Sequence, residues 1–206
     1  MIIRCSSLGK IMTNPKKKTE VLSKGAKTYI KELVVQELFD YKTILDSKYC
    51  DKGIEVEDIS IDLYNEVNST LYLKNTERLT NDWITGECDI NTGDKIIDIK
   101  SSWSLETFPA TSGDIDSKLY EWQLRGYMML YNKEEAELAY CMVNTPPHLL
   151  KDWDYYKIHV VDRIDPTLRV TKLGFERDLE LEEKIKEKVE AAREFAAEYR
   201  NEILNK

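Results

Sequence analysis

The segment Thr85-Gly-Glu-Cys-Asp-Ile-Asn-Thr-Gly-Asp-Lys-Ile-Ile-Asp-Ile-Lys100 carries the strongest fold signal in this chain. Its residues 91–94, Asn-Thr-Gly-Asp, are of the types that favour a tight turn. The stretch that follows, 95–100, is rich in isoleucine and has the composition of a β-strand. The segment therefore predicts a hairpin-like turn that leads into a strand.

This strand is predicted to have two chemically different faces. Side chains along a strand alternate between faces, so Ile97 and Ile99 should point to one side. Asp98 and Lys100 should point to the other side, together with Ile96. Such a strand buries isoleucines on one face and presents an acid and an amine on the other.

A second carboxylate, Asp89, lies just before the turn and nine positions before Asp98. A turn of this length brings the ends of two adjacent strands together, so we expect the two carboxylates to meet. Lys100 follows Asp98 by two residues on the same face of the strand. Two carboxylates with a neighbouring lysine suit a divalent metal beside an amine, which is the equipment that cleaves phosphodiester bonds.

Length and composition indicate an ordinary globular protein. A chain of 206 residues and 24.1 kDa with a hydrophobic content of 42% predicts one domain, residues 1–206, with a proper core. No run of 18 apolar residues occurs, so we expect no membrane span. The apolar stretch after Met1 is too short for a signal peptide, and a cytoplasmic location is expected.

The four cysteines do not form a metal-binding pattern. Cys5, Cys50, Cys88 and Cys141 are far apart, without the close pairs typical of zinc and iron–sulfur sites. A disulfide framework is not expected in a cytoplasmic chain. We therefore expect all four to be packing residues.

The net charge of −8 and the pI near 5.0 argue against broad, non-specific coating of DNA. They are compatible with a nuclease whose basic groups line one groove while acidic groups cover the outside. The basic run Lys16-Lys17-Lys18 is the local exception. It is either a solvated loop or an edge that contacts phosphate.

Periodicity of the apolar residues predicts helices and strands in alternation along most of the chain. Helices are expected at 19–39, from about 53 to 67, at 115–131, and from 179 to the C-terminal region. Strands are expected at 71–73, 83–84, 95–100, 136–143, 156–161 and 168–175, with loops at 47–52 and 101–117. This order fits a single α/β or α+β domain.

Two of the predicted helices have a well-defined apolar face. The inner face of the 53–67 helix should consist of Val56, Ile59, Leu63, Tyr64 and Val67. The inner face of the 115–131 helix should consist of Leu119, Trp122, Gly126, Tyr127 and Leu130. On the same helix, Gln123 and Tyr127 are four residues apart and share one face.

Four motifs occur in a recognisable order: Gly53-x-x-x-Glu57, Gly86-x-x-Asp89, Asp98-x-Lys100 and Gln123-x-x-x-Tyr127. Each motif is weak alone, but their order and spacing are specific. Together they resemble the PD-(D/E)XK nucleases, and most closely the lambda-exonuclease / YqaJ viral recombinase family of phages and prophages. The resemblance runs from Ser7 to Tyr127, and the C-terminal strands and long helix also suit that family. It implies an α/β restriction-endonuclease-like core with a central mixed β-sheet flanked by helices.

The resemblance also implies roles for the acidic residues. Asp89 would bridge the metal ions and Asp98 would be the second carboxylate ligand, at a position where many relatives have Glu. The carbonyl group of Ile99 would be a further ligand. Glu57 would be the helix acid that helps to hold metal, with Glu55 or Asp58 as alternatives.

The remaining implied roles concern water and substrate. Lys100 would orient or deprotonate the attacking water, and Gln123 would brace the site. Ser7 would contact the phosphate of the degraded strand, with Ser6 as its rival. Tyr127 is a candidate for contacting substrate, with core packing as the alternative.

By this resemblance the chain is expected to be a deoxyribonuclease that uses Mg²⁺ or Mn²⁺, with two ions per site. The most direct reading is a phage-type exonuclease that resects double-stranded DNA ends 5′ to 3′ in recombination. A homotrimer around DNA and a single-strand annealing protein would be its partners. The alternatives are an endonuclease or helicase-coupled nuclease with the same core, and a catalytically silent DNA-end-binding subunit.

The sequence departs from the family pattern in two places. Cys88 stands where the family name has proline, a position that varies widely. Only six residues precede Ser7. Lambda-like relatives have a longer N-terminal arm at this place, and it carries an arginine near the 5′-phosphate. This second departure affects the expectations for end recognition and direction more than the expectation for hydrolysis.

Overall fold

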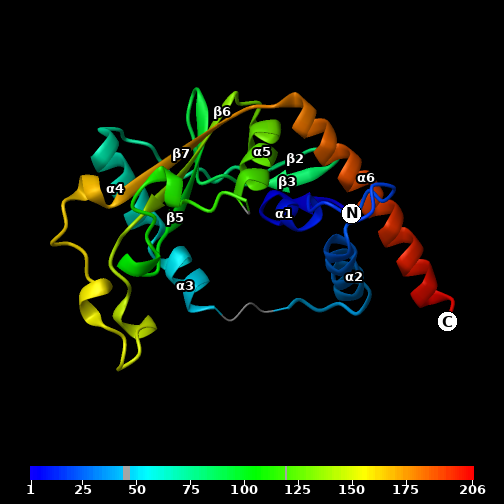
Figure 1. Ribbon diagram of the computed structural model, residues 1–206, viewed down its shortest axis with the longest axis horizontal. Helices are drawn as coiled ribbons and strands as arrows, with labels where there is room; N and C mark the ends of the chain where they lie inside the picture. The colour runs from blue at the N-terminus through cyan, green and yellow to red at the C-terminus, as the bar shows by residue number, and fades with distance from the viewer. Residues whose placement is uncertain (44–46, 119) are drawn as a thin grey trace.

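The computed structural model describes residues 1–43, 47–118 and 120–206 (Figure 1). The strands are β1 (Ile3–Arg4), β2 (Leu79–Thr80), β3 (Ile84–Gly86), β4 (Ile90–Asn91), β5 (Lys95–Ser101), β6 (Glu135–Cys141) and β7 (Val170–Glu176). The helices are α1 (Leu8–Ile11), α2 (Lys24–Leu38), α3 (Lys48–Glu55), α4 (Glu57–Asn68), α5 (Tyr120–Tyr131) and α6 (Leu179–Leu204). The chain is thus an α/β protein with mixed sheets and a long C-terminal helix, as the sequence predicts.

The strands form two mixed sheets instead of the one central sheet expected. Three short strands pair in the order β1-β3-β2, and four strands pair in the order β4-β5-β6-β7. In the larger sheet β5 lies between an antiparallel partner, β4, and a parallel partner, β6. Parallel neighbours need a crossover connection, and α5 provides it between β5 and β6.

The two faces of β5 are covered by different helices. Ile96 belongs to the larger core, which also contains Leu124 and Met128 of α5. Ile97 and Ile99 belong to a second core with residues of α4. The alternation predicted for this strand is therefore confirmed, and it places α4 and α5 on opposite sides of the larger sheet.

The long helix α6 begins where the sequence predicts. Asp178 caps it, because its carboxylate accepts hydrogen bonds from the backbone N–H groups of Glu180 and Leu181. The helix packs against α2 through buried residues such as Ile185 and Val189 (Figure 1). No helix among residues 1–43, 47–118 and 120–206 is both long and apolar enough to cross a bilayer.

The strand expected at 71–73 is absent, and that expectation was wrong. Leu71 is 94% exposed and Leu73 is 85% exposed. The amide side chain of Asn65 takes the place of a strand partner, since it donates to the carbonyl of Tyr72 and accepts from the N–H of Tyr72, both at 2.9 Å. The preceding helix ends at Ser69 in the left-handed region, with φ of 54°.

The prediction of a strand at 156–161 is also wrong. Residues Tyr156–Ile158 form a 3-10 helix, and the N–H groups of Ile158 and His159 bond to carbonyls only three residues back. The strands predicted at 168–175 and 136–143 are confirmed as β7 and β6. The alternation in residues 156–161 therefore accompanies a 3-10 turn, and the carbonyl of His159 bonds to the N–H of Thr145 at 3.0 Å.

Helix boundaries differ from the predictions in two regions. The expected loop at 47–52 is the start of α3, and a break at Val56 separates α3 from α4. Because α4 starts anew after this break, Ile59 lies on its outer side and is 57% exposed, whereas the sequence predicts it to be buried. The helix expected at 115–131 begins at Tyr120, and the predicted core residue Leu119 lies outside the described residues.

A buried lysine explains why α3 forms where a loop was expected. Lys52 is completely buried, and its ammonium group donates to the carbonyls of Ser102 (2.5 Å), Trp103 (3.1 Å) and Val143 (3.0 Å). Burial lowers the pKa of Lys52 to about 8, while three carbonyl acceptors match the three N–H donors of the charged form. Lys52 thus joins α3 to the chain just beyond the ends of β5 and β6.

We predict that Lys52→Met lowers the free energy of unfolding by about 3 kcal/mol or more, because three buried carbonyls lose their donor. Urea denaturation followed by circular dichroism measures this change. Lys42→Met, at an exposed lysine, is the matched control and should stay within about 0.5 kcal/mol of the wild type. Equal midpoints for the two variants would contradict the prediction.

Candidate active site

The pairing of β4 with β5 brings the two predicted aspartates together. Ile90 pairs with Ile97, so the next antiparallel pair outward places Asp89 opposite Asp98. Oδ2 of Asp89 accepts a hydrogen bond of 2.6 Å from the backbone N–H of Ile99. The nine-residue spacing of the sequence is therefore a hairpin register, and both carboxylates lie at the same end of the sheet.

Asp98 is fully buried, and its two carboxylate oxygens have different surroundings. Oδ1 accepts a hydrogen bond of 3.0 Å from Nε2 of Gln123, which also donates to the hydroxyl of Tyr127 at 3.0 Å. Oδ2 lies 2.5 Å from Nζ of Lys100. This oxygen is therefore neutralised by a short ion pair with the lysine.

Lys100 is half-buried beside the two aspartates. Its Nζ lies 3.4 Å from the carbonyl oxygen of Ile99 and 5.3 Å from the centre of the Tyr120 ring. Burial by itself lowers the pKa of Lys100, but the carboxylates of Asp98 and Asp89 outweigh burial and raise it. Lys100 is therefore a cation in this arrangement.

The carboxylates of the cluster repel one another. Burial, and then the charge of Asp98, raise the pKa of Asp89 to about 7, although Lys100 and the N–H of Ile99 oppose the change. The charge of Glu57 adds a smaller contribution in the same direction. Folding thus holds acidic groups together that would separate in water.

Of the three candidate helix acids, Glu57 is the one whose charge contributes to the raised pKa of Asp89. Glu57 is the first residue of α4, is half-buried, and forms an ion pair of 2.6 Å with Lys74. Its alternatives are exposed, and Glu55 instead lies 3.1 Å from His148. Lys74 was not anticipated from the sequence, because it follows exposed leucines in a segment without periodicity.

The structure brings together only part of the metal-ligand set expected from the sequence. In the described part of the chain, no set of three or more His, Cys, Asp and Glu side chains is grouped closely enough to hold a metal ion. The two aspartates nevertheless converge, since the charge of Asp98 acts directly on Asp89. Carboxylate oxygens and a backbone carbonyl such as that of Ile99 are ligands that Mg²⁺ and Mn²⁺ prefer.

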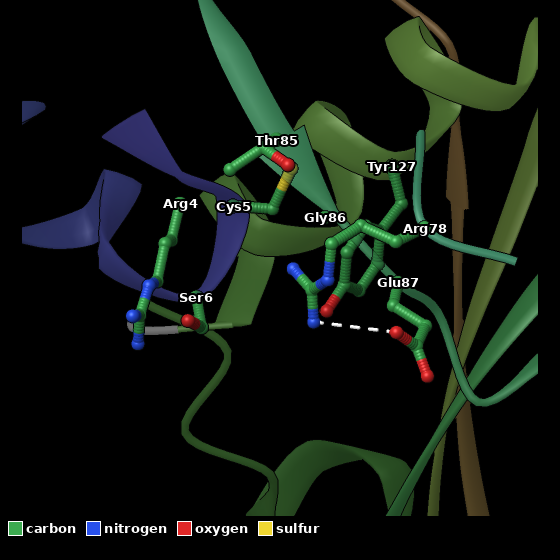
Figure 2. A pocket seen from close by; sticks show the side chains of 8 residues that line it. All are labelled: Arg4, Cys5, Ser6, Arg78, Thr85, Gly86, Glu87 and Tyr127. Atoms are coloured by element: carbon green, nitrogen blue, oxygen red, sulfur yellow. Dashed lines mark ion pairs between the residues drawn. The ribbon is translucent and has the colours of Figure 1, made fainter. Parts of the chain in front are cut away.

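A pocket of about 530 Å³ opens beside the cluster (Figure 2). Tyr127 belongs to both, because its ring lines the pocket and its hydroxyl contacts Gln123. Arg78 and Glu87 form an ion pair of 3.3 Å within the pocket. The full lining is Arg4, Cys5, Ser6, Arg78, Thr85, Gly86, Glu87 and Tyr127.

Of the two candidate serines, Ser6 lines the pocket, and Ser7 is not among its lining residues. Figure 2 shows Arg4 and Ser6 at one side of the opening and Glu87 at the other, with the guanidinium of Arg78 and the Tyr127 hydroxyl between them. The arginines were not singled out in the sequence because each is isolated there. Their convergence depends on β1, which carries Arg4 beside β3.

Close packing at one glycine helps to shape this pocket. A Cβ atom at Gly86 would lie 2.6 Å from the Tyr127 ring and 2.8 Å from Sγ of Cys5.

Cys5, Cys88 and Cys141 are buried, Cys50 is exposed, and all four are free thiols. Three of the cysteines therefore have the environment of packing residues, and Cys50 does not.

The fold and the acidic cluster define a mixed α/β protein of the nuclease class. No family model and no curated protein matches the chain. Among solved structures, it is similar to a phage-related exonuclease from Haemophilus somnus 129PT, with 34% identity and a TM-score of 0.91 over 100% of this chain and 96% of the other. The chain belongs to this family of phage-related exonucleases.

A second solved structure supports the fold. It is an alkaline exonuclease, LHK-Exo, from Laribacter hongkongensis, with 17% identity and a TM-score of 0.71 over 99% of this chain and 92% of the other. The same exonuclease in complex with dAMP gives 18% identity and a TM-score of 0.67 over 97% and 90% of the two chains.

We predict that Asp89→Asn stabilises the metal-free protein. The folded-state pKa of Asp89 lies above its ordinary value of 3.8, so its ionisation disfavours folding increasingly as pH rises from about 4 to about 7. Asparagine retains an oxygen for the N–H of Ile99 without the charge. In EDTA at about pH 8, the variant should gain roughly 1–2 kcal/mol in the free energy of unfolding.

Urea denaturation at several pH values checks this prediction. The gain should shrink as the pH falls from about 7 to about 4 and be absent below about pH 4, where the wild-type carboxyl is protonated in both the folded and the unfolded state. Asp58→Asn, at an exposed acid of the same region, is the control and should show no such pH-dependent gain. A less stable Asp89→Asn variant at about pH 8 would contradict the electrostatic account.

Proposed function

We propose that this protein is a metal-dependent deoxyribonuclease of the PD-(D/E)XK superfamily, of the lambda-exonuclease / YqaJ type. The observation that carries this proposal is the meeting of Asp89, Asp98 and Lys100 at the end of β5, beside an open pocket that contains arginines. Family membership among phage-related exonucleases supports the same activity.

In this proposal Asp89, Asp98 and the carbonyl of Ile99 hold Mg²⁺ or Mn²⁺, two ions per site, with Glu57 assisting. Such ions make water a better nucleophile and stabilise the leaving oxygen of a phosphodiester. Gln123 holds Asp98 in place through its 3.0 Å hydrogen bond. Lys100 would orient the attacking water through an N–H of Nζ, and it would have to release its own proton to solvent before it could accept one from that water.

The pocket supports action at a DNA end. Arg4, Arg78 and Ser6 supply two guanidinium groups and a hydroxyl group to the pocket, although Glu87 offsets the charge of Arg78, and these donors suit a terminal phosphate. The solved LHK-Exo structure with dAMP supports a mononucleotide as the product. We therefore propose that the protein resects double-stranded DNA 5′ to 3′ and releases mononucleotides during recombination.

The setting proposed for this activity is the cytoplasm, that of the host if the gene is carried by a phage. A homotrimer around DNA and a single-strand annealing protein are the proposed partners. An endonuclease with the same core is the second candidate function, because the same carboxylates and lysine could act on an internal phosphodiester.

We predict that Asp98→Ala and Lys100→Ala each reduce the rate of DNA cleavage by about 10²–10⁴-fold, since each removes a group that acts on charge or protons in the reaction. Lys95→Ala is the matched control: it lies on the same strand but on the opposite face, paired with Glu137 at 2.7 Å. Cleavage of linear duplex DNA in Mg²⁺ gives the rates, and circular dichroism verifies folding. Near-normal cleavage by both site variants would reject the assignment.

Linear and covalently closed circular DNA distinguish the two candidate functions. An exonuclease should degrade an end-labelled linear duplex and leave the closed circle intact. If the pocket receives a terminal phosphate, a linear duplex with a 5′-phosphate should be degraded faster than one without it. Cleavage of the closed circle at a comparable rate would favour the endonuclease.

A further inference from the structure

Positive charge is concentrated at the N-terminal end of this acidic chain. Residues 1–31 contain eight Lys and Arg residues and a single acid, Glu20. The other 175 residues contain 22 Lys and Arg against 37 Asp and Glu. A net charge of +7 in the first segment and −15 in the remainder is the kind of asymmetry that indicates an anionic partner.

Six of these basic side chains are exposed and free of carboxylates. These six residues are Arg4, Lys10, Lys16, Lys17, Lys18 and Lys24. Within the described residues, none of the six forms an ion pair with an acid. We call this set the N-terminal basic surface. Lys27 and Lys31 differ, since Lys27 pairs with Glu20 at 3.7 Å and Lys31 lies over the Tyr199 ring of α6 at 4.5 Å.

The N-terminal basic surface starts at the candidate active site. Arg4 lines the pocket that shares Tyr127 with the catalytic cluster. The chain then forms α1, which packs against both α5 and α2, and Lys10 of α1 lies 4.6 Å from the centre of the Tyr29 ring of α2. Figure 1 shows α1 between the strand β3 and helix α2, with the following loop close to α6.

The loop that carries the three consecutive lysines is held at its base. Nζ of Lys188 on α6 donates to the carbonyl of Thr13 at 3.1 Å and to that of Val21. The hydroxyls of Thr13 and Ser23 are 2.6 Å apart, and the N–H of Glu20 bonds to the carbonyl of Lys17. A loop fixed in this way can present its lysines without a large loss of backbone entropy on binding.

We propose that the N-terminal basic surface binds the phosphate backbone of duplex DNA and guides it to the pocket. This inference rests on the proposed function, since it takes DNA as the substrate. Lysines act as point charges without base readout, which suits sequence-independent contact with phosphates. The net −15 of the remaining chain repels DNA from other faces, so the duplex has one favourable approach.

The salt dependence of binding tests the proposal. Fluorescence anisotropy measures the affinity for a labelled duplex of about 30 base pairs, with Ca²⁺ in place of Mg²⁺, between about 50 and 200 mM KCl. The test variant is Lys16→Gln with Lys17→Gln and Lys18→Gln. It should reduce the magnitude of the slope of log K against log[KCl] by about 2–3, because each phosphate contact contributes roughly 0.9.

A second triple variant provides the matched control. Lys42→Gln with Lys157→Gln and Lys206→Gln removes the same charge from exposed lysines outside this surface. Its slope should change by less than about one. Equal slope changes in the two triple variants would overturn the proposal, because net charge alone would then explain the binding.

Two further measurements separate this inference from the proposed function. Light scattering should show the same molar mass for both triple variants; a changed mass with an unchanged slope would assign the surface to a protein contact and overturn the proposal. At low salt and saturating DNA, the lysine-loop variant should retain wild-type turnover. Absence of DNA cleavage by the wild-type protein would instead refute the proposed nuclease, whatever the slopes show.

Discussion

The register between β4 and β5 is the constraint on which the candidate site depends. Because β4 has only two residues, the turn that follows it must fix the alignment. The hydroxyl of Thr92 bonds to the carbonyl and N–H of Lys95 at 2.8 and 2.9 Å, and Nζ of Lys133 bonds to two carbonyls of the turn. A slip of one residue would send Asp98 to the opposite face and separate it from Asp89.

The site concentrates negative charge at a cost to stability. Burial and the neighbouring carboxylate hold the pKa of Asp89 above its ordinary value, and Lys100 and Lys74 offset only part of this repulsion. Carboxylates arranged in this way favour a divalent cation, because its positive charge would offset the repulsion that the two lysines leave. The same positive charge is what a scissile phosphate needs, and this links the instability of the cluster to its proposed chemistry.

Sequence reasoning succeeded where a single periodicity controlled the structure. The two faces of β5, the start of α6 at Leu179 and the shared helix face of Gln123 and Tyr127 all follow from spacing alone. It failed where side chains replaced backbone partners. Asn65 satisfies the backbone of the segment expected as a strand at 71–73, and Lys52 supports a helix where a loop was expected.

The sequence alone determined the α/β class, the hairpin that carries both aspartates and the alternation that separates Asp98 and Lys100 from the isoleucines, because these depend on residues close together in the chain. Only the tertiary structure decided that Glu57, unlike the exposed Glu55 and Asp58, is half-buried and paired with Lys74, and that Arg4, Ser6 and Arg78 meet in one pocket. The physical reason is that these contacts join segments that no local pattern relates. Their geometry is set by how α4 and β1 pack against the sheets.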